Sequence, residues 1–580
     1  MENTTRGPVA PKDPVMKREG FYIMQEKEIS AAPTPDGRGV CFIYEDSGRL
    51  ENSAKLVGNV EDEEILSLMG TVAGFRKLVH SIGVSIKAGD GKENARFAFQ
   101  MYGHTDPYVT GTTLTMDIPT DGMEYVYDLG LAEWSDDDNI PGQIRFEFDK
   151  SGFTADVSVI FYLNDGYKAP KQNEINPIDF ESDAYKHIIE KSLINQGNNA
   201  RLKKAFAKAR AGEDVTVAFI GGSITQGAGA VPINMNCYAY LTFEGLCQML
   251  GRGTDENLHY IKAGVGGTPS ELGMLRYEKD VLRDGEVIPD IVVIEFAVND
   301  EGDETKGVCY DSLTRKVYNG PGKPAVILLY AVFSNDWNLE ERLTPVGEKY
   351  NLPMVSTRRS VVEQFYQTKE EGNVIAKSQF FYDCFHPANP GHRIMADGIL
   401  NMLRRADEAD ADEELDITTI AAPIGADFEH VFTFDAAMDA AKLESLGIVM
   451  DRGSFTGTDT DIQCVEKNLD SFASPELPDN WMYEGTCQGG IEPFSFDTEC
   501  SAVLLMYKDS ASVEVGEALV YVDGELKLEV DPHIVGWTHC NALIVINEKE
   551  TKMHHVEVRI KSGCENKKFT ILGFGIVRKR

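Results

Sequence analysis

Two short segments of the sequence carry residues that could make and break an ester bond. Ser223 stands between glycine and isoleucine directly after the apolar run 215–220. Much later in the chain, Asp383 precedes His386 by three residues. At this spacing a carboxylate can bind the Nδ1–H of the imidazole and leave Nε2 free to take a proton from a hydroxyl. The segments are therefore candidates for an exposed hydroxyl and for the base that would activate it.

Each of these segments alone also fits a purely structural role. Gly221–Gly227 fits an ordinary strand-to-helix turn, and Asp383–His386 fits a capped helix start with a surface histidine. A phosphate-binding loop is excluded at the first segment, because no Lys-Ser or Lys-Thr pair follows in the required register. His392 lacks an acid at the same spacing, so we expect it to be structural.

Two further segments contain hydrogen-bond donors that a negatively charged oxygen would need. Gly266 and Gly267 follow one predicted strand, and Asn299 follows another. A backbone N–H and a side-chain amide are the usual donors of an oxyanion hole. Taken singly, each segment also fits an ordinary loop.

The surrounding pattern predicts a parallel sheet that would bring the four segments to one edge. Apolar runs alternate with helical patterns at 215–220, about 237–250, 291–298, 325–333, about 358–369 and about 391–405. Strands that alternate with helices are typical of an α/β fold with a parallel sheet. In such sheets ligands lie beyond the carboxyl ends of the strands, which is where these segments stand.

Taken in order, the four segments resemble the blocks of the SGNH (GDSL-like) hydrolase family. The family is named for Ser, Gly, Asn and His in four blocks, with an Asp three residues before the His. The resemblance covers about residues 195–405 and implies a three-layer α/β/α domain that hydrolyses esters without a metal or an organic cofactor. It implies these site residues: the nucleophile Ser223, the base His386 with its orienting Asp383, and the oxyanion donors Ser223, Gly267 and Asn299, with Gly266 able to replace Gly267.

Two positions depart from the family pattern and point to one branch. The first block usually contains Gly-Asp-Ser, but Gly222 stands in place of the acid, and Lys262 stands where the second block often has Asn. The sequences Gly-Gly-Ser-Ile-Thr at 221–225 and Glu-Phe-Ala-Val-Asn-Asp at 295–300 look more like those of the branch that deacetylates plant polysaccharides. By this analogy we expect a serine esterase that removes acetate from xylan or mannan fragments, with Trp337 as a candidate for lining the substrate cleft.

Strand patterns flank the α/β region on both sides. Apolar residues alternate strictly at 153–161 and again at 556–560, as in strands with one buried face. We predict a polar tail at 1–20, an N-terminal, jelly-roll-like β-sandwich at 21–170, the catalytic domain at 171–410 and a second antiparallel β-sandwich at 426–580. Segment 536–539 of the second sandwich is a candidate for reaching the active site.

Composition restricts the partners and the compartment. Among 580 residues, 56 are basic and 93 acidic, and the net charge of −37 would repel nucleic acid and anionic membranes. We therefore expect an acetylated oligosaccharide or polysaccharide as the partner, with a homo-oligomer left open. The ten scattered cysteines and the lack of a signal-peptide pattern favour the cytoplasm, and secretion with the leader missing from the sequence is the alternative.

Two other functions fit the same residues. A lipid or thioester hydrolase of the same family would use the same site, although no apolar lid or membrane-binding helix is evident near the motifs. A carbohydrate-binding protein with an inactive α/β domain would use Trp134, Trp481 or Trp537 as stacking surfaces, although a core position is more typical for tryptophan.

Overall fold

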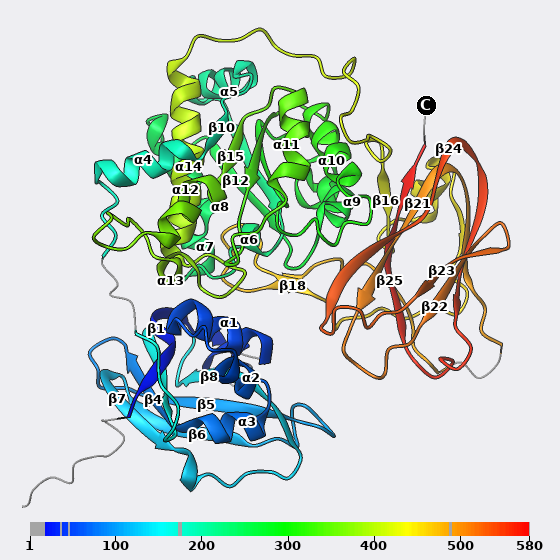
Figure 1. The fold of residues 1–580 in the computed structure, drawn as a ribbon. Helices are drawn as coiled ribbons and strands as arrows, with labels where there is room; N and C mark the ends of the chain where they lie inside the picture. Colours follow the sequence, from blue (N-terminus) through cyan, green and yellow to red (C-terminus); the bar gives the residue numbers. More distant parts are fainter. Residues whose placement is uncertain (1–17, 35–37, 45–46, 172–176, 487–489, 579–580) are drawn as a thin grey trace, which may run out of the picture. The chain divides into compact units, whose positions relative to one another are not determined.

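The computed structural model describes residues 18–34, 38–44, 47–171, 177–486 and 490–578 (Figure 1). Contacts divide the chain into two compact units, Met1–Asp179 with Gln367–Ala388 and Phe180–Tyr366 with Asn389–Arg580. Residues 1–17 of the predicted tail at 1–20 lie outside the described residues. The first strand begins at Gly20, the last residue of the predicted tail.

The first unit contains two antiparallel sheets with the strand orders β1-β9-β4-β7 and β2-β3-β8-β5-β6. The strands are β1 (Gly20–Ser30), β2 (Ala32–Pro33), β3 (Gly39–Tyr44), β4 (Val79–Lys87), β5 (Asn94–Gly103), β6 (Thr113–Pro119), β7 (Asp121–Asp128), β8 (Asp138–Phe148) and β9 (Thr154–Leu163). Ala155, Val157 and Val159 are buried on one face of β9, as their alternation predicts.

Three helices of this unit were not predicted by the sequence pattern. They are α1 (Ser47–Gly58), α2 (Glu63–Met69) and α3 (Val72–Leu78), between β3 and β4. The predicted β-rich pattern did not include these helices, which the two antiparallel sheets of the unit accompany. Asp62 and Thr71 begin α2 and α3, because their side chains accept the N–H groups of Glu64 at 2.9 Å and of Gly74 at 3.1 Å. A fourth helix, α13 (Lys377–Phe380), lies in the later segment of the unit.

The second unit contains a six-stranded sheet with the order β10-β15-β14-β13-β11-β12. Its strands are β10 (Leu193–Asn195), β11 (Val215–Gly221), β12 (Leu258–Gly264), β13 (Ile291–Glu295), β14 (Ala325–Tyr330) and β15 (Met354–Ser356). All neighbouring pairs except β10–β15 are parallel, which confirms the predicted parallel sheet. β13 is shorter than the predicted 291–298, because the chain turns after it and the N–H of Asn299 donates to the carbonyl of Phe296 at 3.0 Å.

Helices cover both faces of this parallel sheet (Figure 1). They are α4 (Asp183–Lys191), α5 (Ala200–Arg210), α6 (Ser223–Gln226), α7 (Ile233–Asn236), α8 (Tyr238–Met249), α9 (Ser270–Asp280), α10 (Val308–Tyr318), α11 (Glu340–Lys349), α12 (Thr357–Val361) and α14 (Asn389–Glu408). Val292 and Ile294 pack with residues of α9, α10 and α11, whereas Ile291 and Val293 pack with α5, α8 and α14. Within the described ranges, no helix has the length and apolar character that a membrane crossing demands.

The C-terminal part of the second unit is an antiparallel sheet with the order β16-β25-β21-β24-β22-β23, to which β17 and β20 also pair. Its elements are β16 (Phe432–Phe434), α15 (Ala440–Ser445), β17 (Val449–Asp451), β20 (Trp481–Tyr483), β21 (Phe494–Asp509), β22 (Ala518–Val522), β23 (Glu525–Val530), β24 (His539–Ile560) and β25 (Phe569–Val577). Residues 459–476, here called the arm, stand apart from this sheet and contain the two-stranded pair β18 (Cys464–Val465) and β19 (Ser474–Pro475).

Candidate active site

Ser223 lies just beyond the carboxyl end of β11, as the first residue of α6. β11 pairs with β12 on one side and with β13 on the other. The chain therefore leaves all three strands at the same edge of the sheet, where an α/β fold places its ligands. The predicted glycines follow β12 and the predicted asparagine follows β13, so this register explains how three distant segments meet. The residues that end the three strands side by side are Gly264, Gly221 and Glu295.

Contacts at this edge bring the first segment against the other two. A Cβ built on Gly266 would lie 3.7 Å from the Cβ of Ser223. A Cβ built on Gly222 would overlap the side-chain amide of Asn299, with the Cγ of that residue at 2.6 Å. In this chain, Asn299 thus fills the space that any side chain at 222 would need. The structure gathers Ser223, Gly266 and Asn299 into one cluster.

Two glutamine side chains hold the backbone of Gly266. Its N–H donates to Gln226 Oε1 at 2.9 Å, and its carbonyl accepts from Gln463 Nε2 at 2.8 Å. Lys262, the second departure from the family pattern, is buried and donates from Nζ to the carbonyl of Gln226 at 2.8 Å. Burial lowers the pKa of this ammonium. Sequence reasoning missed both glutamines, and Gln463 has no local signal because its partner is 197 residues away.

Gly267 has a backbone conformation that favours glycine, and residues of the C-terminal part of the unit lie beside it. Its φ of +75° lies in the left-handed region that favours glycine. A Cβ here would meet His539 Nε2 at 2.8 Å and Trp537 Cζ2 at 3.0 Å, so segment 536–539 does reach this edge of the sheet. Trp537 is 44% exposed, whereas burial lowers the pKa of His539 to about 4 and keeps its ring neutral at physiological pH.

A buried carboxylate fixes the loop that carries Asn299. Asp300 accepts the N–H of Ser270 at 2.7 Å and its hydroxyl at 2.9 Å. Ser270 begins α9, directly after the segment with Gly267, so this carboxylate joins the two loops that carry the predicted donors. Burial and the nearby charge of Asp303 raise the pKa of Asp300.

Glu295 is fully buried beside α6. Thr225 of that helix donates to Glu295 Oε2 at 3.4 Å and shares a 2.8 Å hydrogen bond with the hydroxyl of Tyr238. Burial raises the pKa of Glu295 to about 8, so the carboxyl is mainly protonated at neutral pH.

We expect Glu295→Gln to change how stability depends on pH. The glutamate ionises near 4.5 when unfolded and near 8 when folded, so between these values the folded state binds more protons. Wild-type stability therefore falls as pH rises through this window, whereas a glutamine does not titrate. The melting temperature of the variant minus that of the wild type should therefore rise from pH 4.5 to 8. The corresponding change in the difference in free energy of unfolding is on the order of a few kcal/mol.

Thermal unfolding followed by circular dichroism at several pH values measures this difference. Glu213→Gln is the matched control, because Glu213 is an exposed glutamate of the same unit, and its difference from wild type should stay nearly constant. If the difference in melting temperature between Glu295→Gln and wild type is also independent of pH, burial does not raise the pKa of Glu295.

The predicted acid–histidine pair is formed in the first unit. His386 Nδ1 lies 2.8 Å from Asp383 Oδ2 and 3.0 Å from Oδ1. The same carboxylate accepts the N–H of Phe385 at 2.7 Å and of His386 at 2.8 Å. Burial alone would raise the pKa of Asp383, but His386, the Phe385 N–H and the charge of Lys27 outweigh it and hold the pKa below its ordinary value. An ionised carboxylate beside Nδ1 favours the tautomer that carries its proton on this nitrogen and has Nε2 as the basic one.

A tight turn positions this pair. The N–H of Tyr382 donates to the carbonyl of His386 at 2.7 Å, and the N–H of Ala388 donates to the carbonyl of Phe380 at 2.8 Å. The ammonium of Lys27 lies 3.9 Å from the centre of the Tyr382 ring, in a cation–π contact. The turn is therefore held from both ends before α14 begins at Asn389.

The other residues singled out in the sequence pack against neighbouring side chains. Trp337 is stacked on Phe333 with ring centres 6.0 Å apart and packs against the cores of the second unit, so its role in the cleft stays a prediction. His392 is buried and accepts the N–H of Tyr238 at 3.2 Å, in agreement with a structural role. Trp481 is buried in the C-terminal core.

The part of the chain that the structure describes offers no group of three or more His, Cys, Asp and Glu side chains that could hold a metal ion. Its nine cysteines form no disulfide with one another, and the tenth, Cys487, lies outside the described residues.

Comparisons with known proteins identify solved structures with the same architecture. No family model matches the sequence, and no curated protein matches it. The chain is similar to the crystal structure of a two-domain esterase (CEX) active on acetylated mannans, with 28% identity and a TM-score of 0.54 over 67% of this chain and 99% of that chain. The same esterase co-crystallised with mannopentaose matches with 26% identity and a TM-score of 0.54 over 68% of this chain and 98% of that chain. Nearly the whole of the solved esterase therefore has a counterpart here.

Proposed function

Because the chain is related to the SGNH-type carbohydrate esterases and is a carboxylic ester hydrolase, we propose that it removes O-acetyl groups from plant-type oligosaccharides or polysaccharides through an acyl-enzyme. One observation carries this proposal. The adjacent ends of β12, β11 and β13 bring Ser223 together with the Gly266–Gly267 backbone and the Asn299 amide. A hydroxyl beside two kinds of oxyanion donor suits acyl transfer.

In the proposed acylation step, Ser223 is the nucleophile and His386 the general base. Nε2 of His386 takes the hydroxyl proton while the serine oxygen attacks the acetyl carbonyl. The N–H groups of Ser223 and Gly267 and the amide of Asn299 stabilise the negative charge on the carbonyl oxygen. The imidazolium then protonates the sugar oxygen as its bond to the acetyl carbon breaks. The sugar leaves as an alcohol, and the acetyl group remains bound to the serine.

Deacylation reverses these roles with water as the attacking group. His386 takes a proton from water, and the hydroxide oxygen attacks the acetyl-serine carbonyl. The tetrahedral intermediate collapses, the serine oxygen regains its proton from the imidazolium, and acetate leaves. Asp383 holds the ring in one orientation throughout both steps.

The chain connects His386 of the first unit directly to the second unit, which contains Ser223. His386 stands three residues before Asn389, a stretch that spans at most about 11 Å. Asn389 begins α14, and its Oδ1 accepts the N–H of Val231 at 2.8 Å. Val231 follows Ala228, whose N–H donates to the carbonyl of Ser223 at 2.9 Å. Asn389, three residues after the histidine, is thus hydrogen-bonded to the loop that continues from the serine.

Acetylated manno-oligosaccharides are the substrate class that we propose first, with acetylated xylo-oligosaccharides second. The similar solved esterase is active on acetylated mannans, and it was also co-crystallised with mannopentaose. The half-exposed ring of Trp537 lies next to Gly267 and offers a face on which a sugar ring can stack. A neutral glycan also suits a chain with a net charge of −37.

Acetate release decides between this substrate class and its rival. We expect faster release of acetate from acetylated manno-oligosaccharides than of p-nitrophenol from a long-chain p-nitrophenyl ester. Preference for the long chain would overturn the carbohydrate assignment in favour of a lipid or thioester hydrolase. Absence of any hydrolysis would favour a carbohydrate-binding protein with an inactive α/β domain.

Asn299→Ala is expected to lower kcat by about 10²–10³-fold, because one of the three proposed oxyanion donors is lost. The fold should persist, since the substitution removes atoms without adding any. Steady-state kinetics with p-nitrophenyl acetate measures the effect. Asn319→Ala is the control, because Asn319 bonds Glu429 at 2.8 Å at the end of α10 and takes no part in the proposed chemistry. Near-normal turnover of Asn299→Ala would remove Asn299 from the site.

We also propose that the antiparallel regions on either side of the α/β part are β-sandwich domains. In the first unit, Phe97 and Phe146 of one sheet share a hydrophobic core with Phe161 of the other. In the C-terminal region, the long strands β21 and β24 pair with register shifts, which let one sheet bend over its own core.

A further inference from the structure

The peptide between Gly266 and Gly267 carries the backbone N–H that the proposed mechanism uses. In a trans peptide, the carbonyl of one residue and the N–H of the next point in opposite directions. Gln463 donates to the Gly266 carbonyl at 2.8 Å and thereby sets the direction of the Gly267 N–H. Glycine has few conformational restrictions of its own, so contacts from other residues must fix the orientation of this peptide.

Gln463 is itself fixed by the C-terminal sheet. It is buried, and its Oε1 accepts the N–H of Cys540, the second residue of β24, at 2.9 Å. Its own carbonyl accepts the N–H of Glu476 at 2.8 Å. One end of the side-chain amide faces an N–H and the other faces a carbonyl, so only one orientation satisfies both partners.

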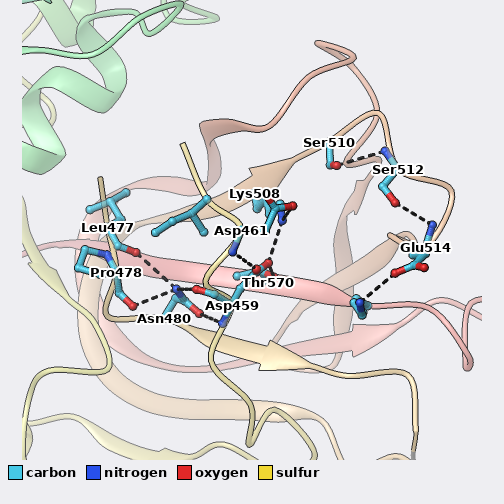
Figure 2. A network of polar contacts seen from close by, with 12 residues as sticks. Asp459, Asp461, Leu477, Pro478, Asn480, Lys508, Ser510, Ser512, Glu514 and Thr570 are labelled. Carbon is cyan, nitrogen blue, oxygen red and sulfur yellow. Dashed lines mark hydrogen bonds and ion pairs between the residues drawn. The ribbon is translucent and has the colours of Figure 1, made fainter. Parts of the chain in front are cut away.

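A polar network around the buried Asp459 anchors the base of the arm to the same sheet (Figure 2). Lys508 on β21 contacts Asp459 Oδ2 and Asp461 Oδ2, each at 3.1 Å. Thr570 on β25 donates to Asp459 Oδ2 at 2.7 Å, and Asn480 bonds both the N–H and the carbonyl of Asp459, at 2.8 and 3.0 Å. Asp459, which all three side chains bind, therefore holds the arm to the sheet four residues before the glutamine.

The arm then continues onto the α/β part, where β18 lies beside α6 (Figure 1). Glu466 Oε2 accepts from Gln226 Nε2 at 2.7 Å, and the Oε1 of the same glutamine accepts the N–H of Gly266. Asn468 Oδ1 accepts the N–H of Lys262 on β12 at 3.1 Å. The glycine loop is thus held from α6 on one side and from the arm on the other.

We propose that Gln463 is a positioning residue of the oxyanion hole, which holds the Gly266–Gly267 peptide so that the Gly267 N–H faces the developing negative charge. The proposal rests on the proposed esterase function. It extends that function, because it makes the C-terminal region part of the catalytic apparatus.

Gln463→Leu tests this role by removing both hydrogen bonds while keeping the volume. Misplacing a catalytic group by about 1 Å can cost about 10²-fold, so we expect kcat to fall about 10- to 100-fold. KM for p-nitrophenyl acetate should stay within about twofold, because an oxyanion donor acts mainly in the transition state. Gln196→Leu is the matched control, since Gln196 also donates to a backbone carbonyl, that of Met402 at 3.0 Å, and its kcat should remain that of wild type.

Gln463→Glu gives a pH signature that a merely structural role would not. At high pH its carboxylate would face the Gly266 carbonyl and push the peptide away, because both oxygens are acceptors. At low pH its protonated form would donate to that carbonyl and restore the orientation. The kcat of Gln463→Glu, divided by that of wild type at the same pH, should therefore rise severalfold from pH 8 to 5, whereas the Gln463→Leu ratio should stay flat.

The outcomes separate this proposal from the function on which it rests. If wild type hydrolyses p-nitrophenyl acetate but Gln463→Leu matches the Gln196→Leu control, the positioning role is overturned while the esterase stands. A pH-independent ratio for Gln463→Glu overturns it as well. If the wild type hydrolyses no ester, the proposed function fails and this inference fails with it.

Discussion

Ser223→Ala is expected to lower kcat for ester hydrolysis by about 10⁶-fold, the largest effect of any substitution considered. In the proposed mechanism, Ser223 supplies the oxygen that receives the acetyl group. Alanine keeps the Cβ that contacts the Gly266 region, so the loop after β11 should fold unchanged. The residual rate would come from the oxyanion donors and substrate binding alone.

Steady-state release of p-nitrophenol and of acetate measures the loss. Ser360→Ala is the control, because this buried serine donates to the Ile188 carbonyl at 2.9 Å and has no role in the proposed chemistry. We expect it to keep wild-type turnover. If Ser223→Ala retains more than about a thousandth of the wild-type kcat, another nucleophile carries the reaction.

Asp383→Asn is expected to lower kcat by about 10⁴-fold, although it changes the side-chain size little. The carboxylate accepts the proton on His386 Nδ1, whereas an asparagine can turn its NH₂ toward that nitrogen. The ring proton then moves to Nε2, and the base can no longer take the proton of Ser223. Stability should change far less than turnover, because the amide oxygen can still accept the N–H of Phe385.

The matched control for this substitution is Asp128→Asn in the same unit. Asp128 accepts the N–H of Gly130 at 2.8 Å in a similar short-range turn but has no histidine partner, so its replacement should leave kcat near wild type. If Asp383→Asn stays within about tenfold of wild-type kcat, the orienting role of Asp383 is wrong.

The site segments could be predicted from sequence because each one is marked by a short local pattern of residues. Buried parallel strands appear as continuous apolar runs, and Ser223 and Asn299 come two and four residues after the ends of two such strands. Asp383 and His386 are three residues apart, a spacing that allows the hydrogen bond seen in the structure. The contact between Gly222 and Asn299 could not be predicted locally, because Asn299 follows a different strand of the sheet.

Other features were missed for two different reasons. The helices α2 and α3 do carry local signals, since Asp62 and Thr71 are good capping residues, but strong alternation in the neighbouring strands favoured a β-rich interpretation. Gln463, in contrast, has no local signal. Its two partners lie on β24 and after β12, and only the folded C-terminal sheet brings them to the same amide.

Labelling with a fluorophosphonate probe tests the central claim most directly, because the reaction requires a serine oxygen that a nearby base activates. Intact-mass and peptide mass spectrometry should find one adduct per chain, on Ser223, and its formation should be strongly slowed in His386→Ala. A wild-type protein that stays unlabelled at Ser223, or a His386→Ala variant that labels as fast as wild type, would contradict the account.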